Sequence, residues 1–260
     1  MLKKKLLVVA LASSFALPAL ADTAPASPFS TNVSLTTNYI YRGISQSGAK
    51  PAVQGGFDYA GASGLYIGAW GSSISWISDE QLGTNAGMEL DTYGGYRGTA
   101  SAVSYDVGFL RYNYPGTYGT LPAVAAKPDT NEVYGAVTYS IVTAKLSYSL
   151  GDLFGVSQAK GSTYVDLSAN YPIGDTGYTV GAHWGKQAYK GTSADTLKAG
   201  GADPSYSDYR LSVSKDLGTG YSASLTYTKT NASTGAGTFY NVLGKDLGKG
   251  AAAIALSRTF

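Results

Sequence analysis

The amino-acid sequence predicts an all-β protein, an antiparallel up-and-down transmembrane β-barrel of about 12 strands. Apolar and polar residues alternate along most of the chain, which places successive side chains on opposite faces of a strand. The connections between the alternating segments are alternately short and long, and tyrosines gather at the ends of these segments. A closed barrel is also the arrangement in which strands satisfy every backbone hydrogen bond within lipid.

The composition narrows the class of protein further. The 260 residues include 34 glycines, 22 tyrosines and no cysteine, and only 14% of them are charged. The absence of cysteine excludes disulfide scaffolds, thiolate zinc sites and thiol catalysis. Hydrophobic residues at 44% and aromatic residues at 12% argue against intrinsic disorder, because such a chain can bury enough apolar surface to fold.

The first 21 residues have the features of a secretory signal peptide. Three lysines at positions 3–5 precede an apolar run over 6–17, and Ala19-Leu20-Ala21 is a cleavage site of the A-x-A type. We therefore expect 1–21 to be removed on export, 22–28 to form a short linker, and 29–260 to form a single barrel domain. Loss of the three lysines leaves 16 basic and 17 acidic residues, so the sequence predicts no nucleic-acid partner.

The strands follow from the alternation. The first is expected to begin at Phe29 and continue to Tyr41, with an outer face formed by Thr31, Val33, Leu35, Thr37, Tyr39 and Tyr41. Eleven further strands are expected over 51–60, 65–75, 88–97, 103–114, 131–140, 143–150, 162–171, 177–186, 206–215, 221–229 and 251–260. A change of phase at Phe109 and Leu110 predicts a β-bulge in the strand over 103–114.

The connections predict two different ends of the barrel. Those after the second, fourth, sixth, eighth and tenth strands hold at most five residues, and the others run from about seven to about 21. This pattern is typical of a barrel with tight turns at one end and loops at the other. The segment 244–250 repeats the sequence KDLG of 215–218. We assign it to a loop, because a further strand would make the number of strands odd.

The outward aromatic residues support the same arrangement, since membrane barrels carry aromatic girdles at both interfaces. Beside the short turns or the terminus we place Tyr59, Tyr96, Tyr105, Tyr139, Tyr171, Tyr178, Tyr221 and Phe260. Beside the long loops we place Tyr39, Tyr41, Tyr148, Trp184, Tyr209 and Tyr227.

The carboxyl terminus and two internal motifs carry a family resemblance. The chain ends in IALSRTF, which resembles the signal that bacterial outer-membrane barrels present to their insertion machinery, although Arg258 stands where an apolar residue is usual. The motifs YRGISQ at 41–46 and PAVQGG at 51–56 are the most specific part of a wider resemblance to the TorF-type porins. This resemblance implies a Gram-negative outer-membrane barrel with channel activity. The carboxyl-terminal signal implies recognition by the insertion machinery through Phe260, and the barrel is expected to contact outer-membrane lipid. It implies no catalytic residues.

The alternation also predicts which charged side chains line the interior. We expect inward acids at Asp58, Glu89, Asp91, Asp106, Glu132, Asp166 and Asp208, and inward bases at Arg42, Arg97, Lys145, Arg210 and Lys215, with His183 beside them. Such a lining predicts a conduit for passive diffusion of small hydrophilic solutes, with a weak cation preference and no cofactor. A wall of salt bridges around a closed lumen, in a structural or binding barrel, is the alternative.

An outer-membrane barrel enzyme is a second alternative. Twelve-stranded outer-membrane phospholipases use a Ser/His pair on a surface that lipid can reach, whereas His183, the only histidine of the chain, is expected to face inward. The sequence also contains no G-x-S-x-G motif. We therefore do not expect the protein to be an enzyme.

Overall fold

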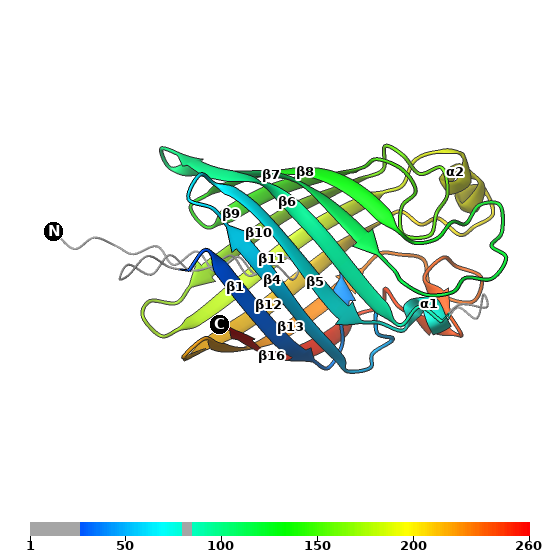
Figure 1. Ribbon diagram of the computed structural model, residues 1–260. Coiled ribbons are helices and arrows are strands. Elements are labelled where there is room, and N and C mark those ends of the chain that lie inside the picture. The colour runs from blue at the N-terminus through cyan, green and yellow to red at the C-terminus, as the bar shows by residue number, and fades with distance from the viewer. Residues whose placement is uncertain (1–26, 80–84) are drawn as a thin grey trace.

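The strands of the computed structural model, which describes residues 27–79 and 85–260, close into a twelve-stranded antiparallel barrel. Figure 1 shows the tilted strands wrapping around one lumen. The predicted signal peptide, 1–21, and residues 22–26 of the linker lie outside the described residues.

The barrel strands agree with the predicted ones within a few residues at nearly every boundary. They are β1 (Phe29–Thr36), β4 (Ala52–Ala60), β5 (Leu65–Ser73), β6 (Met88–Ala100), β7 (Val103–Asn113), β8 (Thr130–Tyr139), β9 (Val142–Ser149), β10 (Thr163–Pro172), β11 (Tyr178–Ala188), β12 (Tyr206–Gly218), β13 (Tyr221–Thr230) and β16 (Ala251–Thr259). Two small ribbons lie in the long loops and pair β2 (Ile40–Tyr41) with β3 (Ile44–Ser45), and β14 (Asn241–Val242) with β15 (Lys245–Asp246). The repeated KDLG segment is therefore in a loop, as predicted, and the barrel count stays even.

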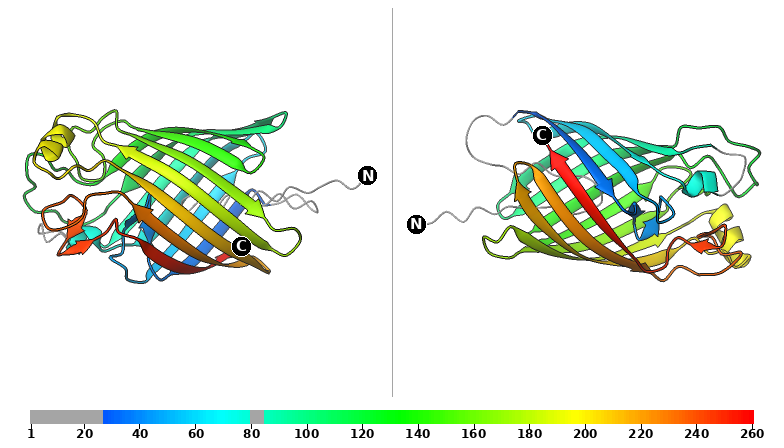
Figure 2. Two further views of the ribbon diagram at one scale, coloured as in Figure 1. Left: turned by 180° about the vertical axis from the view of Figure 1, so that it is seen from behind. Right: turned by 90° about the horizontal axis from the view of Figure 1, so that it is seen from below.

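Strands that follow one another in the barrel pair with each other, and β16 closes the sheet between β1 and β13. Figure 2 shows this closure from below, where the red β16 lies between the blue β1 and the orange β13. All five predicted short turns lie at the end that also holds Phe260, which we call the short-turn end. The other end, called the long-loop end, carries the connections with both helices, α1 (Trp76–Asp79) and α2 (Thr192–Ala199). Neither of these helices has the length and apolar character needed to cross a membrane.

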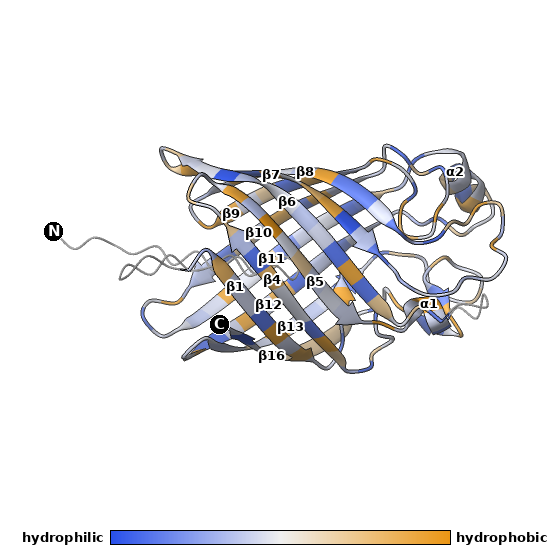
Figure 3. Cartoon of the chain, in the orientation of Figure 1, coloured by the Kyte–Doolittle hydropathy of each residue, from blue (hydrophilic) through white to orange (hydrophobic). Residues whose placement is uncertain are grey.

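The outer face of the barrel is apolar. The hydropathy colours alternate along the strands in Figure 3, as expected when one face is apolar and the other polar. Outward side chains such as Ile67, Leu211 and Ile254 expose about three-fifths of their surface, at 62%, 63% and 59%. So much exposed apolar surface indicates an apolar surrounding, because a monomeric protein in water rarely exposes a continuous apolar band of this kind.

The first strand is shorter than predicted. It ends at Thr36, whose hydroxyl donates to Asn38 O over 2.9 Å, and the chain then turns into the lumen. Tyr39 is therefore buried at 4% exposure and Tyr41 is packed inside, so the prediction that both belong to the outer girdle was wrong. Alternation alone does not distinguish the end of a barrel strand from the start of an inserted hairpin.

Two other details of the predicted register were wrong. The pairing of β6 with β7 runs without a shift from Leu90 to Ala100, so there is no bulge at Phe109; Phe109 faces outward, and Leu110 and Tyr112 face inward. Their apolar character is explained by the aromatic packing inside the long-loop half of the barrel. Lys215 lies on the outer face, where its ammonium sits 4.4 Å from the ring centroid of Tyr178.

Glycines and tyrosines pair across neighbouring strands on the inner face. Tyr93 lies opposite Gly68, Tyr66 lies opposite Gly95, and Tyr134 lies opposite Gly108. A Cβ atom at Gly108 would stand only 2.6 Å from Tyr134 Oη. The tyrosine ring of each pair therefore packs over the backbone of a glycine, where any side chain would overlap it. This pairing gives a structural reason for part of the high glycine and tyrosine content.

Candidate functional site

The hairpin β2–β3 folds into the barrel, where its tip packs against the inner wall. Its tip consists of Arg42 and Gly43, both with positive φ, at 46° and 79°. Two-residue hairpin turns of this kind need left-handed conformations, and glycine adopts them without a steric cost. Gly43 packs against Asp208 and Thr230 on the inner wall so closely that a Cβ atom there would overlap both side chains.

Arg42 extends from the hairpin tip to the opposite wall. Its Nη1 and Nη2 atoms donate to the two carboxylate oxygens of Glu132 on β8, over 2.9 and 2.7 Å, and Nη1 also donates to Gln187 Oε1 on β11 over 2.9 Å. The guanidinium carbon lies 4.2 Å from the ring centroid of Tyr164 on β10 and 5.6 Å from that of Phe154. A bidentate pair with flanking aromatic rings fixes both the position and the orientation of the guanidinium.

Burial by itself acts to lower the pKa of Arg42, because it disfavours a charged group. The neighbouring Glu132 carboxylate outweighs this effect and holds the pKa of Arg42 above its usual value. Each member of the buried ion pair depends on the other for compensation of its charge.

The root of the hairpin is held by a second set of polar contacts. Asn38 Oδ1 accepts hydrogen bonds from Ser45 Oγ over 2.6 Å and from Ser47 Oγ over 3.2 Å. Ser47 Oγ also accepts from the backbone N–H of Tyr39 over 3.0 Å, and the hydroxyl of Tyr39 donates to Glu89 on β6 over 3.0 Å. The hairpin is therefore anchored at its tip and at its root.

The predicted inward residues, apart from Lys215, lie inside the barrel, in two groups. The buried ones are Arg42, Glu89, Asp91, Glu132, Asp166, His183 and Asp208. The partly exposed ones are Asp58, Arg97, Asp106, Lys145 and Arg210. Arg42 differs from the others because it comes from the hairpin and not from a barrel strand. With Lys215 outside, the predicted residues that face the interior are seven acids, four arginine or lysine side chains and His183.

The partly exposed charges are held by the tyrosines of the glycine pairs. Tyr93 donates to Asp58 over 2.5 Å and Tyr66 donates to Asp106 over 2.6 Å. The ammonium of Lys145 lies 4.1 Å from the ring centroid of Tyr134. These contacts keep Asp58, Asp106 and Lys145 along one side of the wall, over β4 to β9, whereas Arg210 lies apart on β12.

A different sector of the wall carries small uncharged side chains. Its strands, β13, β16 and β1, are all described, and their inward residues are serine, threonine, alanine and asparagine, including Ser222, Ser224, Thr226, Ala253, Ala255, Ser257, Ser30, Asn32 and Ser34. Ser257 Oγ donates to Ser34 Oγ over 2.9 Å across the seam of the barrel. Small side chains leave more free cross-section beside this sector than the tyrosines leave opposite.

The hairpin is the part of the site that the sequence prediction missed. Its signal is present, since Arg42-Gly43 stands between the strand-forming pairs Ile40-Tyr41 and Ile44-Ser45, and a left-handed dipeptide with glycine between two such pairs is typical of a tight hairpin. What the sequence does not indicate is that this hairpin enters the lumen.

Comparisons with known proteins give the family of this chain and support its barrel fold. The model of a bacterial protein family of unknown function, Gcw_chp, matches residues 21–260. The chain belongs to the Gcw_chp family. No curated protein matches it.

Among solved structures, the Gcw_chp chain is similar to the KdgM porin, with a TM-score of 0.50 and 10% identity over 89% of this chain and 98% of that chain. It is also similar to the NanC porin, with a TM-score of 0.52 and 8% identity over 88% of this chain and 98% of that chain. At these identities the likeness shows a common barrel fold.

His183 of the Gcw_chp chain lies between two carboxylates on the inner wall. Its Nδ1 is 3.2 Å from Asp166 Oδ2 and its Nε2 is 2.9 Å from Asp208 Oδ1. Tyr164 donates to the second oxygen of Asp208 over 2.9 Å, and Ser168 donates to Asp166 over 2.5 Å. Both ring nitrogens thus point at carboxylates, so the imidazole links β10, β11 and β12. Among the described residues no three acidic or histidine side chains are arranged to hold a metal ion.

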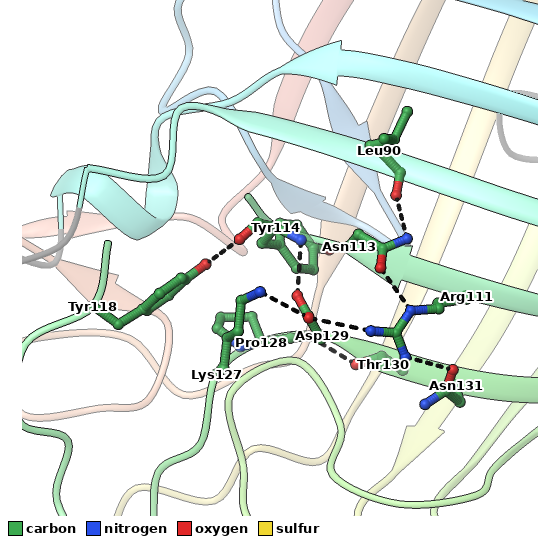
Figure 4. A network of polar contacts seen from close by, with 10 residues as sticks. All are labelled: Leu90, Arg111, Asn113, Tyr114, Tyr118, Lys127, Pro128, Asp129, Thr130 and Asn131. Atoms are coloured by element: carbon green, nitrogen blue, oxygen red, sulfur yellow. Dashed lines mark hydrogen bonds and ion pairs between the residues drawn. The ribbon is translucent and has the colours of Figure 1, made fainter. Parts of the chain in front are cut away.

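A separate polar network ties the loop 114–129 to the outer wall at the long-loop end (Figure 4). Arg111 donates to Asn113, Asn131 and Asp129, and Asp129 also pairs with Lys127 over 2.9 Å. The other oxygen of Asp129 accepts the backbone N–H of Tyr114 over 2.9 Å. These ion pairs are exposed, unlike the pair of Arg42 with Glu132, and contribute correspondingly little to stability.

Proposed function

We propose that this Gcw_chp protein is an outer-membrane channel for passive diffusion of small hydrophilic solutes. The observation that carries the proposal is the closed barrel with an apolar outer face and a charged inner face. Similarity to the KdgM and NanC porins supports it at the level of the fold. The resemblance to TorF-type porins remains a prediction, as do the cleaved signal peptide and the recognition of Phe260 by the insertion machinery.

The solute path that we propose runs along the uncharged sector of β13, β16 and β1 in the short-turn half. In the long-loop half it passes the hairpin β2–β3, which forms the constriction. The tyrosine rings occupy the opposite wall, so the free cross-section is expected beside the small side chains. Solutes that pass such a path have to be narrow and able to exchange water for serine and threonine hydroxyls.

We further propose a weak cation preference for this channel. Seven inward carboxylates outnumber the four inward arginine and lysine side chains, and a low-dielectric wall extends the reach of the excess negative charge. The preference is weak because Glu132 is paired with Arg42 and because the partly exposed group contains three cations, Arg97, Lys145 and Arg210. It is expected to fade as salt shortens the screening length, which is about 10 Å at 0.1 M.

Planar-bilayer recordings of the refolded protein test the proposal. We expect discrete conductance steps and a reversal potential on the cation side in a salt gradient at low ionic strength. Glu132→Gln with Arg42→Gln removes one charge of each sign at the constriction, and it is expected to leave the sign of selectivity unchanged. Insertion without any conductance would remove the channel function and leave the barrel intact.

A barrel with a closed lumen is the second candidate, and the insertion of the hairpin favours it. Arg42 and the aromatic cluster around Tyr112 fill much of the long-loop half. The two candidates differ in one measurement: a closed barrel becomes conductive only when the hairpin is released, as by Arg42→Ala, whereas a channel already conducts in its native form. The hydroxyl of Ser168 is directed at Asp166 and both nitrogens of His183 face carboxylates, so we do not propose an enzyme.

A further inference from the structure

The long-loop half holds a partly open cavity between the hairpin and the loops above it, in which about 550 Å³ of empty space includes open solvent. We call it the aromatic vestibule. Its walls come from separate parts of the chain, including Trp76 of α1, Tyr114 after β7, Phe154 in the loop after β9, Tyr206 at the start of β12, and Phe239 in the loop after β13. A concave site lined mainly by aromatic and aliphatic side chains is typical of small-molecule sites.

The lining of the vestibule is mostly apolar. Eight of the thirteen lining residues are aromatic and three more are aliphatic, while Arg42 and Gln46 are the remaining two. Neighbouring rings are fixed edge to face: the ring centroids of Trp76 and Tyr114 are 5.7 Å apart at 84°, and those of Phe239 and Tyr240 are 4.9 Å apart at 81°. Rings held in this way offer both faces and edges to a further planar ring.

Several polar atoms of the lining are already occupied. The hydroxyl of Tyr41 is hydrogen-bonded to that of Tyr112, and the hydroxyl of Tyr240 donates to Pro204 O over 2.7 Å. Gln46 Nε2 donates to Ile44 O over 3.1 Å. A sugar, which has a hydroxyl on nearly every carbon, would lose more hydrogen bonds to water here than this lining returns.

The charge of the lining is also compensated, because the Arg42 guanidinium faces the Glu132 carboxylate in a bidentate pair. A charged ligand would therefore enter an apolar cavity without a counter-charge of its own, which is costly. The chemistry that fits is an uncharged aromatic ring with at most one or two polar groups.

We propose that the aromatic vestibule binds small uncharged phenol-type molecules at the mouth of the barrel. The ring of the ligand stacks among the fixed aromatic rings, and its single hydroxyl stays near Arg42 and Gln46. If the proposed channel function holds, such molecules are retained at the mouth before they pass the hairpin, and only this consequence rests on the proposed function. The binding itself requires only the folded barrel.

Calorimetric titration of the detergent-solubilised barrel with 4-methylphenol tests the proposal. Val242 lines the vestibule and is buried, so Val242→Trp fills the cavity. Val137 lies on the outer face with 53% exposure, so Val137→Trp adds the same indole to the surface that detergent covers. We expect saturable binding of one equivalent to the native protein and to Val137→Trp, and binding at least tenfold weaker to Val242→Trp. Glucose at the same concentrations is expected to give no saturable heat.

Phe239→Ala provides a second variant, which removes one wall ring without adding bulk, and it is also expected to weaken binding. Both variants are first checked for heat-modifiable migration, the sign of a closed barrel. Equal affinity in the native protein and in folded Val242→Trp and Phe239→Ala, or only the linear heat of partition into detergent, would overturn the proposal. Conductance without this binding leaves the channel function standing, and binding without conductance leaves the vestibule standing.

Discussion

The insertion of the hairpin into the barrel can be tested by limited digestion with trypsin. Arg42 is protected in the native barrel, with only 6% of its side chain exposed, and the peptide bond that trypsin would cleave joins it to Gly43. Glu132→Ala removes the carboxylate that compensates the buried guanidinium. We expect the hairpin then to leave the lumen much more often, so that trypsin cleaves after Arg42.

The magnitude follows from the geometry of the pair. Removing one member of a buried ion pair destabilises the arrangement by about 3 to 5 kcal/mol, and each 1.4 kcal/mol changes an equilibrium about tenfold. The population with a released hairpin, and with it the cleavage rate, should rise roughly 10²- to 4 × 10³-fold. The barrel itself should keep its stability, because the twelve paired strands do not depend on the hairpin.

The assay is limited trypsin digestion of the refolded protein with mass-spectrometric detection of the new amino terminus at Gly43. Glu132→Gln retains one acceptor for Arg42 and should give an intermediate rate. Asp129→Ala is the matched control, since it removes a carboxylate from an exposed pair with Arg111 and Lys127 and leaves the hairpin untouched. Cleavage after Arg42 at the native rate in Glu132→Ala would refute the view that this pair holds the hairpin in place.

Three further predictions concern the barrel wall. Deleting Phe260, whose backbone N–H donates to Thr31 O over 2.9 Å at the seam, should lower the yield of assembled barrel in the outer membrane, measured as heat-modifiable protein in membrane fractions; an unchanged yield would speak against its role. Leu211→Arg should cost roughly 2 to 4 kcal/mol in folding into lipid, whereas the inward neighbour Ser212→Arg should cost much less in the same denaturant titration; equal costs would mean that the faces are misassigned. Gly68→Val should push the Tyr93 ring away and destabilise the barrel by about 1 to 3 kcal/mol, and Tyr93→Ala in the same chain should restore part of this loss; no rescue would show that the two positions are not coupled.

The wall of the barrel was predictable because it obeys a local rule. Each residue of a strand faces either lipid or lumen, so residues such as Leu211 and Asp208 reveal their sides through their sequence neighbours alone. The predicted short turns and long loops, the even number of strands and most of the outer girdle follow from the same rule. Lys215, near the end of β12, was placed on the wrong side although it keeps the alternation, since it shares the outer face of β12 with Tyr209 and Leu211 and its ammonium lies beside the Tyr178 ring.

The polarity of the inward side chains was harder to predict than their side of the strand. Leu110 and Tyr112 are apolar, and the sequence offers no sign that they face an aromatic cluster inside the barrel instead of lipid. An apolar side chain is equally suited to both surroundings. The mistaken bulge therefore came from the assumption that every inward position is polar.

By itself the sequence determined a twelve-stranded barrel, its two ends, and the side on which nearly all of its charged residues lie. Only the tertiary structure decided that residues 40–45 leave the wall and fold into the barrel, and that loops from separate parts of the chain meet above them as a vestibule. The physical reason is the distance along the chain: Arg42 and Glu132 are 90 positions apart, and nothing local to either residue indicates that closing the barrel brings them within hydrogen-bonding reach.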